Sequence, residues 1–375
     1  MTIPGSKRAT RHDLVRQVGM SGNYWYVVEQ EKHLPRGQAT EVTFWKTSIA
    51  LYRGQDGIVR ALENRCAHRH LRLSEGQVEE NALTCAYHGW TYNGDGKCVR
   101  ISHELGKARS TMPDICLRSY PVRCKYGLIW LFPGNPALAD SVPLPSFPVL
   151  DGPRPWPFVP IDMTIQAHFS MVVENVCDFN HAYLHRKYKP FWNPHARAMW
   201  RDDDTIYIDY DTHLGQGQAA RVASEDTGKH LNFIRIWYQY PYQGSDLQGK
   251  YFHWLYMLPI DEQTTRCFFY FVFGPMEIPY VRLNVPFVLR NRKSSLLLNR
   301  RSRSIVLSAA CPCSRAPDLA GGLHYQLELA PLFVLRQQVT GGGRRKAALG
   351  AQGQVLDRDI ARRLVDAVQQ LVLGF

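Results

Sequence analysis

Residues 65–70 read Arg-Cys-Ala-His-Arg-His, and residues 85–92 read Cys-Ala-Tyr-His-Gly-Trp-Thr-Tyr. The first stretch presents Cys66 and His68, and after a gap of sixteen residues the second presents Cys85 and His88. Two thiolates and two imidazoles on two loops are enough to complete one metal site. A structural zinc site uses the same ligand types, and a chance grouping of four residues is the other alternative.

The order of the ligands separates these alternatives. Zinc modules favour pairs of Cys or pairs of His, whereas each loop here supplies one of each. A Rieske [2Fe–2S] cluster requires that alternation, because one iron takes both cysteines and the other takes both histidines. We therefore predict a Rieske cluster bound by Cys66, His68, Cys85 and His88. His70 falls outside the spacing, and we expect it at the surface or beside a ligand.

The composition is that of a globular protein. The chain has 375 residues, 45% of them hydrophobic and 21% charged, which excludes a disordered tail or a small disulfide scaffold. No apolar run reaches the ~18 residues that a transmembrane helix needs, and the N-terminus lacks the apolar core of a signal peptide. Nine cysteines without a signal indicate a reducing compartment, so we expect a cytoplasmic protein.

The net charge of +12 is concentrated in one segment. Between Arg282 and Lys346 lie twelve Lys and Arg and only two acids, a net charge of +10. A general nucleic-acid-binding face is therefore not expected. Residues 282–303 combine seven basic residues with short apolar runs, which suits either peripheral contact with an anionic membrane or a solvated stretch.

Strand, turn and proline signals predict an α+β protein with two domains. Short segments rich in aromatic and β-branched residues, such as 24–28, 41–45 and 127–132, indicate an all-β N-terminal domain. Nine of the 23 prolines follow between Pro133 and Pro160, where they cannot sustain helix or ladder pairing. The expected parts are an N-terminal extension, the all-β domain, a linker, and a second domain of antiparallel strands and helices: residues 1–22, 23–133, 134–160 and 161–375.

A second set of metal-binding side chains lies on a helix expected over residues 171–185. Asp178, His181 and His185 are spaced by three and four residues, which would place them on one helix face. Two imidazoles one turn apart can hold one Fe(II), and a further carboxylate completes a 2-His-1-carboxylate triad with open positions for O₂ and substrate. A polar helix face with chance histidines is the alternative.

Together, the two motifs resemble those of the Rieske non-haem iron oxygenases, the group that includes the α-subunits of aromatic-ring-hydroxylating enzymes. The resemblance covers residues 25–273 and is greater to the single-chain branch acting on chlorophyll-pathway and sterol substrates. It implies a catalytic domain of the helix-grip (START-like) kind behind the Rieske domain. It also implies that His181 and His185 hold the mononuclear Fe(II), and that Asp178 links the Rieske histidine of a neighbouring subunit to this site.

The resemblance places the third iron ligand far downstream, on a late helix. Residues 355–361 are similar to the family's segment, with Asp359 in the ligand position and Asp357 as the alternative. The chain departs from the family in two respects. Three residues rather than four separate the two histidines, and residues 290–350 match poorly.

The resemblance also implies a reaction and partners. A Rieske oxygenase of this branch uses O₂ to hydroxylate, desaturate or oxidatively demethylate a bulky apolar substrate of the aromatic, sterol or terpenoid kind, and it works as a homotrimer. The sequence contains neither a GxGxxG fingerprint nor a plant-type ferredoxin run. Electrons from NAD(P)H are therefore expected to arrive through a separate ferredoxin or flavin reductase. Monooxygenation and dioxygenation both stay open.

Two other functions are compatible with parts of the sequence. The chain would be a Rieske electron-transfer protein if the mononuclear iron site were incomplete, and a basic scaffold protein if both metal sites had decayed. Aromatic residues at even spacing form three pairs that share a face of their strand, and either a substrate pocket or ordinary core accounts for them. The pairs are Phe233 with Trp237, Trp254 with Tyr256, and Phe268 with Tyr270.

Overall fold

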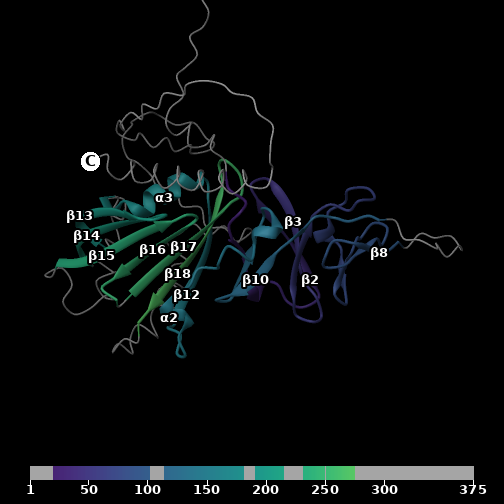
Figure 1. Cartoon of the computed structure of the whole chain (residues 1–375), viewed down its shortest axis with the longest axis horizontal. Helices are drawn as coiled ribbons and strands as arrows, with labels where there is room; N and C mark the ends of the chain where they lie inside the picture. The colour runs from purple at the N-terminus through teal and green to yellow at the C-terminus, as the bar shows by residue number, and fades with distance from the viewer. Residues whose placement is uncertain (1–19, 102–113, 181–190, 215–230, 250, 275–375) are drawn as a thin grey trace, which may run out of the picture. The chain divides into compact units, whose positions relative to one another are not determined.

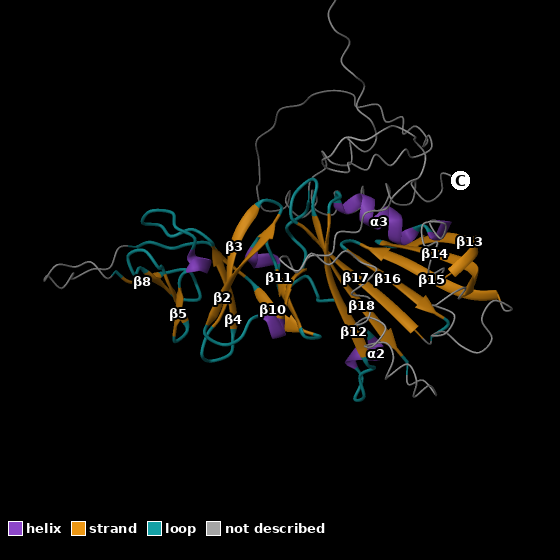
Figure 2. Cartoon of the chain, turned by 180° about the vertical axis from the view of Figure 1, so that it is seen from behind, coloured by secondary structure: helices purple, strands orange, loops and turns teal. Residues whose placement is uncertain are grey.

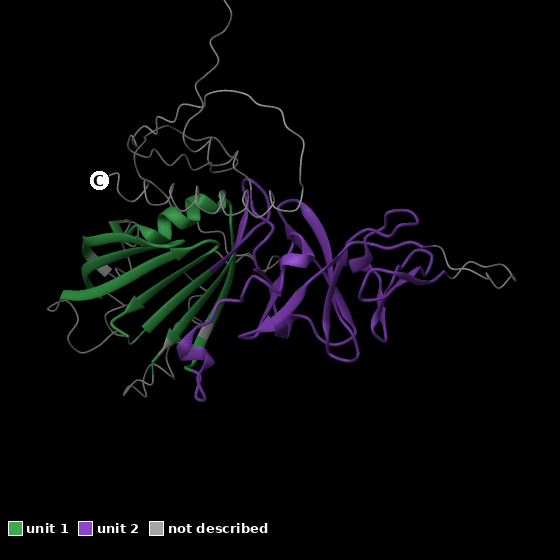
Figure 3. Cartoon of the chain, in the orientation of Figure 1, with its two compact units in different colours: residues 1–18, 156–255, 267–375 green, residues 19–155, 256–266 purple. Residues whose placement is uncertain are grey.

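A computed structural model describes residues 20–101, 114–180, 191–214, 231–249 and 251–274 (Figure 1). Strands dominate this part of the chain, with a few short helices (Figure 2). The described residues divide into two compact units (Figure 3). The first unit, drawn in purple, is made of those within 19–155 and 256–266, and the second unit, drawn in green, of those within 156–255 and 267–274. Among the described residues, none of the helices combines the length and apolar character that crossing a membrane requires.

The first unit is all-β, as the sequence predicts, and consists of three small antiparallel sheets. Their strand orders are β1-β11-β10, β2-β3-β4-β9 and β5-β6-β7-β8. The strands are β1 (Tyr26–Gln30), β2 (Gln38–Phe44), β3 (Thr47–Arg53), β4 (Val59–Glu63), β5 (Gln77–Glu79), β6 (Ala82–Thr84), β7 (Thr91–Tyr92), β8 (Cys98–Arg100), β9 (Ser119–Tyr120), β10 (Val122–Lys125) and β11 (Leu128–Leu131). The short helices are η1 (Glu31–His33), η2 (Leu73–Glu75), η3 (Pro136–Leu138) and α2 (Pro148–Asp151).

Aromatic and aliphatic side chains of the predicted strand segments form the cores of this unit. Trp25, Trp130 and Phe132 are fully buried, and the Trp25 and Phe132 rings meet edge to face at 5.3 Å. A second cluster under the sheet β5–β8 includes Cys66 and Cys85 themselves. The two predicted cysteine ligands are thus anchored in apolar packing.

The hairpin between β7 and β8 is closed by the predicted turn at residues 93–96. Gly96 has φ +86°, and its carbonyl accepts a hydrogen bond from the Leu117 N–H at 2.9 Å. A Cβ atom at this position would lie 2.1 Å from the Leu117 oxygen. Glycine is therefore required here by both backbone conformation and space.

We expect Gly96→Ala to lower the free energy of unfolding of the first unit by about 2 kcal/mol, because it adds left-handed strain and a backbone clash. Gly152→Ala is the matched control, since the nearest atom to its added Cβ is 3.4 Å away. Denaturant unfolding followed by near-UV circular dichroism measures both. Equal midpoints for the two variants would contradict this account of the turn.

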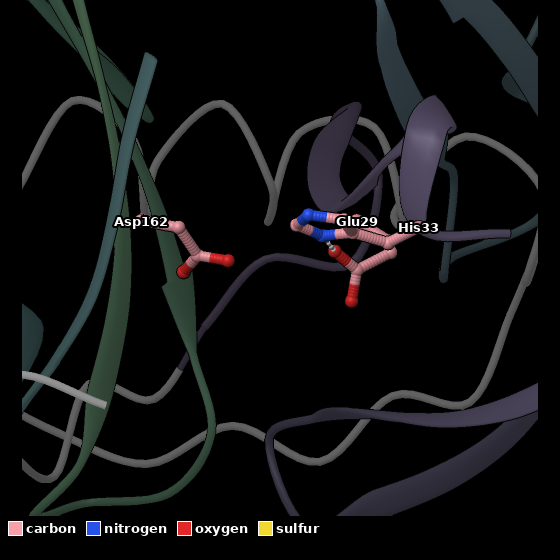
Figure 4. Close-up of side chains that lie close together, drawn as sticks. All are labelled: Glu29, His33 and Asp162. Atoms are coloured by element: carbon pink, nitrogen blue, oxygen red, sulfur yellow. Dashed lines mark hydrogen bonds and ion pairs between the residues drawn. The ribbon is translucent and has the colours of Figure 1, made fainter. Parts of the chain in front are cut away.

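Within the first unit, a charged contact at Arg266 joins residues 256–266 to strand β1. Its guanidinium donates to both carboxylate oxygens of Glu29 at 3.0 Å and to the Val28 carbonyl at 3.1 Å. Glu29 also bonds to Nδ1 of His33 at 2.9 Å (Figure 4). Burial raises the pKa of Glu29, but Arg266 and these hydrogen bonds outweigh it and lower that pKa overall, so the carboxylate stays charged.

The second unit is built on one seven-stranded antiparallel sheet in the order β12-β18-β17-β16-β15-β14-β13. The strands are β12 (Phe158–Ile165), β13 (Phe191–Asp202), β14 (Thr205–Leu214), β15 (Leu231–Gln239), β16 (Tyr242–Leu247), β17 (Tyr251–Pro259) and β18 (Thr265–Phe273). Helix α3 (Phe169–Cys177) connects β12 to the far edge of the sheet and lies across one face of it (Figures 1 and 2). A sheet with a helix across one face matches the predicted α+β class.

Alternation along the strands gives the sheet two different faces. Ile208 and Tyr210 of β14 are buried on the side of α3, where the Tyr210 hydroxyl donates to the Cys177 carbonyl at 3.3 Å. We call this side the helix-bearing face. The intervening residues, such as Tyr207 and Arg235, point to the opposite side, which we call the outer face.

Candidate metal centres

The four side chains predicted to bind the first metal group lie together in the first unit. Cys66 and His68 are on the loop after β4, and Cys85 and His88 are on the loop between β6 and β7. The two thiols are 2% and 3% exposed, and the His68 and His88 rings approach to 4.5 Å between centroids. The thiol side of the site is therefore buried, whereas both histidines are only partly buried.

The two loops have the same backbone design. In each, the cysteine N–H donates to the carbonyl five residues later, and the N–H four residues later donates to the cysteine carbonyl. These bonds are Cys66–Leu71 at 2.9 Å, His70–Cys66 at 2.9 Å, Cys85–Trp90 at 2.8 Å and Gly89–Cys85 at 3.0 Å. His70 and Gly89 occupy the same turn position, with φ +59° and +64°. His70 is exposed, and its observed role is in this turn.

The residues present suit a Rieske cluster. Nδ1 of His68 is buried and has no hydrogen-bond partner among the described residues, which is costly for a polar atom unless it binds something else. Burial raises the pKa of the Cys85 thiol, with the adjacent Cys66 thiol adding to it, so a bound metal would have to displace the proton. Two thiolates and two imidazole nitrogens, one of each per loop, form the donor set of such a cluster.

Aromatic rings hold the two histidines in place. The indole of Trp90 stacks on His68 at 4.9 Å with an interplanar angle of 4°, and Tyr87 lies 3.7 Å from His88. Ring contacts of this kind restrict the rotation of an imidazole.

Tyr92 is a further member of the site that ligand spacing alone does not reveal. Its hydroxyl lies 3.3 Å from Sγ of Cys66 and accepts a hydrogen bond from the Ala67 N–H at 3.1 Å. Burial raises the pKa of Tyr92, so its O–H stays protonated and can donate to the sulfur. The contact joins residues 26 positions apart. This contact forms because β6 pairs with β7, which brings Tyr92 under the first loop.

We expect Tyr92→Phe to lower the reduction potential of the cluster by about 40 mV. A hydrogen bond to a ligand sulfur favours the more electron-rich reduced state, and ~1 kcal/mol corresponds to about this shift for one electron. A redox titration of the cluster measures it. Tyr52→Phe, which removes a hydroxyl from the same core, is the control and leaves the potential unchanged. A Tyr92→Phe potential equal to wild type would contradict the O–H to sulfur bond.

Asp178 lies at the end of α3, and here the structure corrects the sequence prediction. The helix expected over 171–185 ends at Cys177, and Asp178 has extended backbone angles (φ −102°, ψ 106°). Its Oδ1 accepts the N–H of Asn180 at 2.8 Å, a local turn that competes with helical bonding. The single helix expected over 171–185 is therefore interrupted at Asp178, and the placement of His181 and His185 on one face with it stays a prediction.

The predicted ligands of the mononuclear iron lie outside the described residues. These are His181 and His185, which follow Asp178 directly, and Asp359 with its alternative Asp357. Asp178 itself is partly buried, and the Phe179 ring beside it stacks on Tyr210 at 5.3 Å. The structure thus places the start of the second motif on the helix-bearing face of the sheet.

The three aromatic pairs divide between core and the outer face. Trp254, Tyr256, Phe268 and Tyr270 are almost completely buried and belong to the core. Trp237 instead lines a hollow on the outer face together with Tyr207, Arg235 and Phe252, among others. Arg235 of that face is held by Asp209 at 2.8 and 3.0 Å and lies over the Phe233 ring. Period-two spacing shows that two residues share a face, but not which face it is.

Comparison with known proteins gives a consistent set of similarities. Residues 24–121 match the family model of the Rieske [2Fe–2S] domain. The chain is 56% identical over 280 residues to the 4beta-methylsterol monooxygenase of Methylococcus capsulatus (Bath), covering 75% of this chain and 76% of that protein. It is 36% identical over 168 residues to the oxygenase component of dicamba O-demethylase of Stenotrophomonas maltophilia, an alignment that spans 47% of that relative. Dicamba monooxygenase bound to dicamba has a similar fold, with a TM-score of 0.62 at 24% identity over 74% of this chain and 84% of that one.

Proposed function

This chain belongs to the Rieske non-haem iron oxygenases, and from that premise we propose that it oxidises a methyl group of a methylsterol. The observation that carries the substrate class is the 56% identity to a 4beta-methylsterol monooxygenase over three quarters of both chains. The reaction proposed is a monooxygenation. One oxygen atom of O₂ enters a methyl C–H bond and the other leaves as water, at the expense of two electrons and two protons.

The chain's own residues form two proposed metal sites, one for electron transfer and one for the mononuclear iron. Cys66, His68, Cys85 and His88 would hold the [2Fe–2S] cluster, which supplies one-electron transfer when bound. Their partly exposed histidine side suits passage of an electron to and from other proteins, while the buried cysteine side keeps water away. We propose that His181, His185 and Asp359 hold the mononuclear Fe(II).

We assign Asp178 a positioning role between the two sites. Its Oδ1 is fixed by the Asn180 N–H, so the carboxylate is held at the start of the histidine motif. A carboxylate oriented in this way can accept a hydrogen bond from a histidine N–H and set which ring nitrogen carries the proton. In this proposal the donor is a Rieske histidine of another subunit on one side and a ligand of the mononuclear iron on the other.

The proposal includes the redox partner, the oligomeric state and the location of the protein. The relatives named as oxygenase components belong to systems with further proteins, and we propose a ferredoxin or flavin reductase as the source of electrons from NAD(P)H. We further propose a cytoplasmic homotrimer in which residues 23–133 form the Rieske domain, 134–160 the linker and 161–375 the catalytic domain. The basic segment 282–303 would provide peripheral contact with a membrane that supplies the apolar substrate.

Turnover under ¹⁸O₂ tests the proposed reaction. Anaerobically reconstituted protein, a surrogate ferredoxin and reductase, NADPH and a 4,4-dimethylsterol are combined, and the products are analysed by mass spectrometry. The expected product carries one ¹⁸O at the C4 methyl carbon, while an aromatic herbicide such as dicamba is not consumed. Oxidation of the aromatic compound with no attack on the sterol would overturn the substrate class.

A further inference from the structure

Among the described residues of the helix-bearing face, a histidine lies within a group of aromatic rings. His253 of β17 stacks with Phe269 at 5.3 Å and with Phe271 at 5.0 Å, both on the adjacent strand β18. The two phenylalanine rings also stack on each other at 6.2 Å with an interplanar angle of 9°. Together they form a flat apolar wall with a single imidazole in it.

The imidazole has a buried nitrogen without a partner. Nε2 of His253 is inaccessible to solvent and makes no hydrogen bond to any described residue. Leaving such an atom without a hydrogen bond is unfavourable, so a buried unpartnered nitrogen in a folded protein calls for an explanation. A ligand group that bonds to Nε2 would remove this cost.

The orientation of His253 follows from its neighbour in the chain. Phe252 lines the hollow on the outer face, so the next residue along the strand points to the helix-bearing face. That face also carries Tyr210, which contacts the end of α3, next to Asp178. His253 and the start of the proposed iron motif therefore share one side of the sheet.

We propose that Nε2 of His253 binds the hydroxyl group of an otherwise apolar substrate whose ring skeleton lies against Phe269 and Phe271. This inference rests on the proposed function, and it names the contact that orients the substrate. A sterol has one hydroxyl, at C3, and C4 is the neighbouring carbon. Holding that hydroxyl fixes the position of a C4 methyl group, whose carbon is three bonds from the hydroxyl oxygen.

The chemistry of the site favours a neutral ligand. Burial lowers the pKa of His253 to about 4, so the ring is uncharged near neutral pH and gains little from a carboxylate. A hydroxyl suits a neutral imidazole in either tautomer, because it can both donate and accept. An apolar alcohol is therefore preferred over an acid of the same shape.

A binding experiment with four proteins and two steroids tests the proposal. The iron-loaded wild type, His253→Phe, His253→Gln and the control His195→Phe are titrated anaerobically with a 4,4-dimethylsterol and with its 3-deoxy analogue. His195 lies exposed on the edge strand β13, so its variant makes the same chemical change outside the face in question. Circular dichroism and iron content confirm that each variant is folded and loaded.

The expected result is a difference between the two steroids. His253→Phe should bind the alcohol about tenfold more weakly than wild type and the deoxy analogue as wild type does, with partial recovery in His253→Gln. Equal affinity of the wild type for both steroids, or equal losses for both in His253→Phe, would overturn the contact. If wild-type protein binds the alcohol more tightly than the deoxy analogue but does not oxidise the sterol, the proposed reaction is refuted and the contact stands. Binding of neither steroid would refute both.

Discussion

Replacing Cys66 by serine is expected to remove the cluster and bring turnover down to the level of a protein-free control. Serine is a poor ligand for iron in place of a buried thiolate, and Cys85 alone cannot hold the iron that takes both cysteines. Bound iron should fall from about three to about one per chain. The EPR signal of the reduced cluster should vanish with it.

Cys98→Ser is the matched control for this variant. Cys98 is 1% exposed and belongs to the same core as Cys66, but it lies outside both ligand loops. It should keep full iron content and its EPR signal, at a cost in stability of about 1 kcal/mol. A cluster that survives in Cys66→Ser, or is lost equally from both variants, would contradict the assignment of the ligands.

Asp178→Asn is expected to lower turnover about 100-fold while leaving the cluster intact. The amide oxygen of asparagine can still accept the Asn180 N–H, so the local turn persists. The negative charge that we propose to orient the histidines on either side is lost. The rate at which O₂ and substrate oxidise the reduced cluster in rapid mixing measures this effect directly.

Glu174→Gln tests whether the effect is specific to Asp178. Glu174 lies one turn earlier on α3, and burial, followed by the charge of Asp178, raises its pKa. Like Asp178→Asn, Glu174→Gln replaces one carboxylate by an amide. It leaves the proposed link between the two metal sites unchanged. It should leave the rate within about twofold of wild type. A similar loss in both variants would show that the helix end needs a charge only for its structure.

The sequence predicts those features that depend on local chemistry. Cys66, His68, Cys85 and His88 identify a cluster because ligand type and spacing are set by the metal group, not by the rest of the fold. The turn at 93–96 and the segments of β1, β2 and β11 follow from backbone preferences that act over a few residues. The structure contains this turn and these strands, and it brings the four side chains together.

The features that the sequence did not reveal depend on contacts with residues distant in the chain, or on two local conformations of similar free energy. The hydroxyl of Tyr92 reaches Cys66 only because β6 and β7 pair. Asp178 ends α3 because its side chain bonds to the backbone at Asn180, a preference that competes closely with helix continuation. His253 and Phe252 alternate along β17, and only the packed sheet shows which of them faces the helix.

Anaerobic purification followed by metal analysis and EPR tests the central claim most directly. A chain with a Rieske cluster and a mononuclear iron should contain about three irons and no zinc, and after reduction it should give the EPR signal of a cluster with mixed Cys and His ligands. Zinc in place of iron, or iron without this signal, would contradict the assignment of the chain's first unit. About two irons with the signal would contradict the second site at His181, His185 and Asp359, and with it the proposed oxygenation.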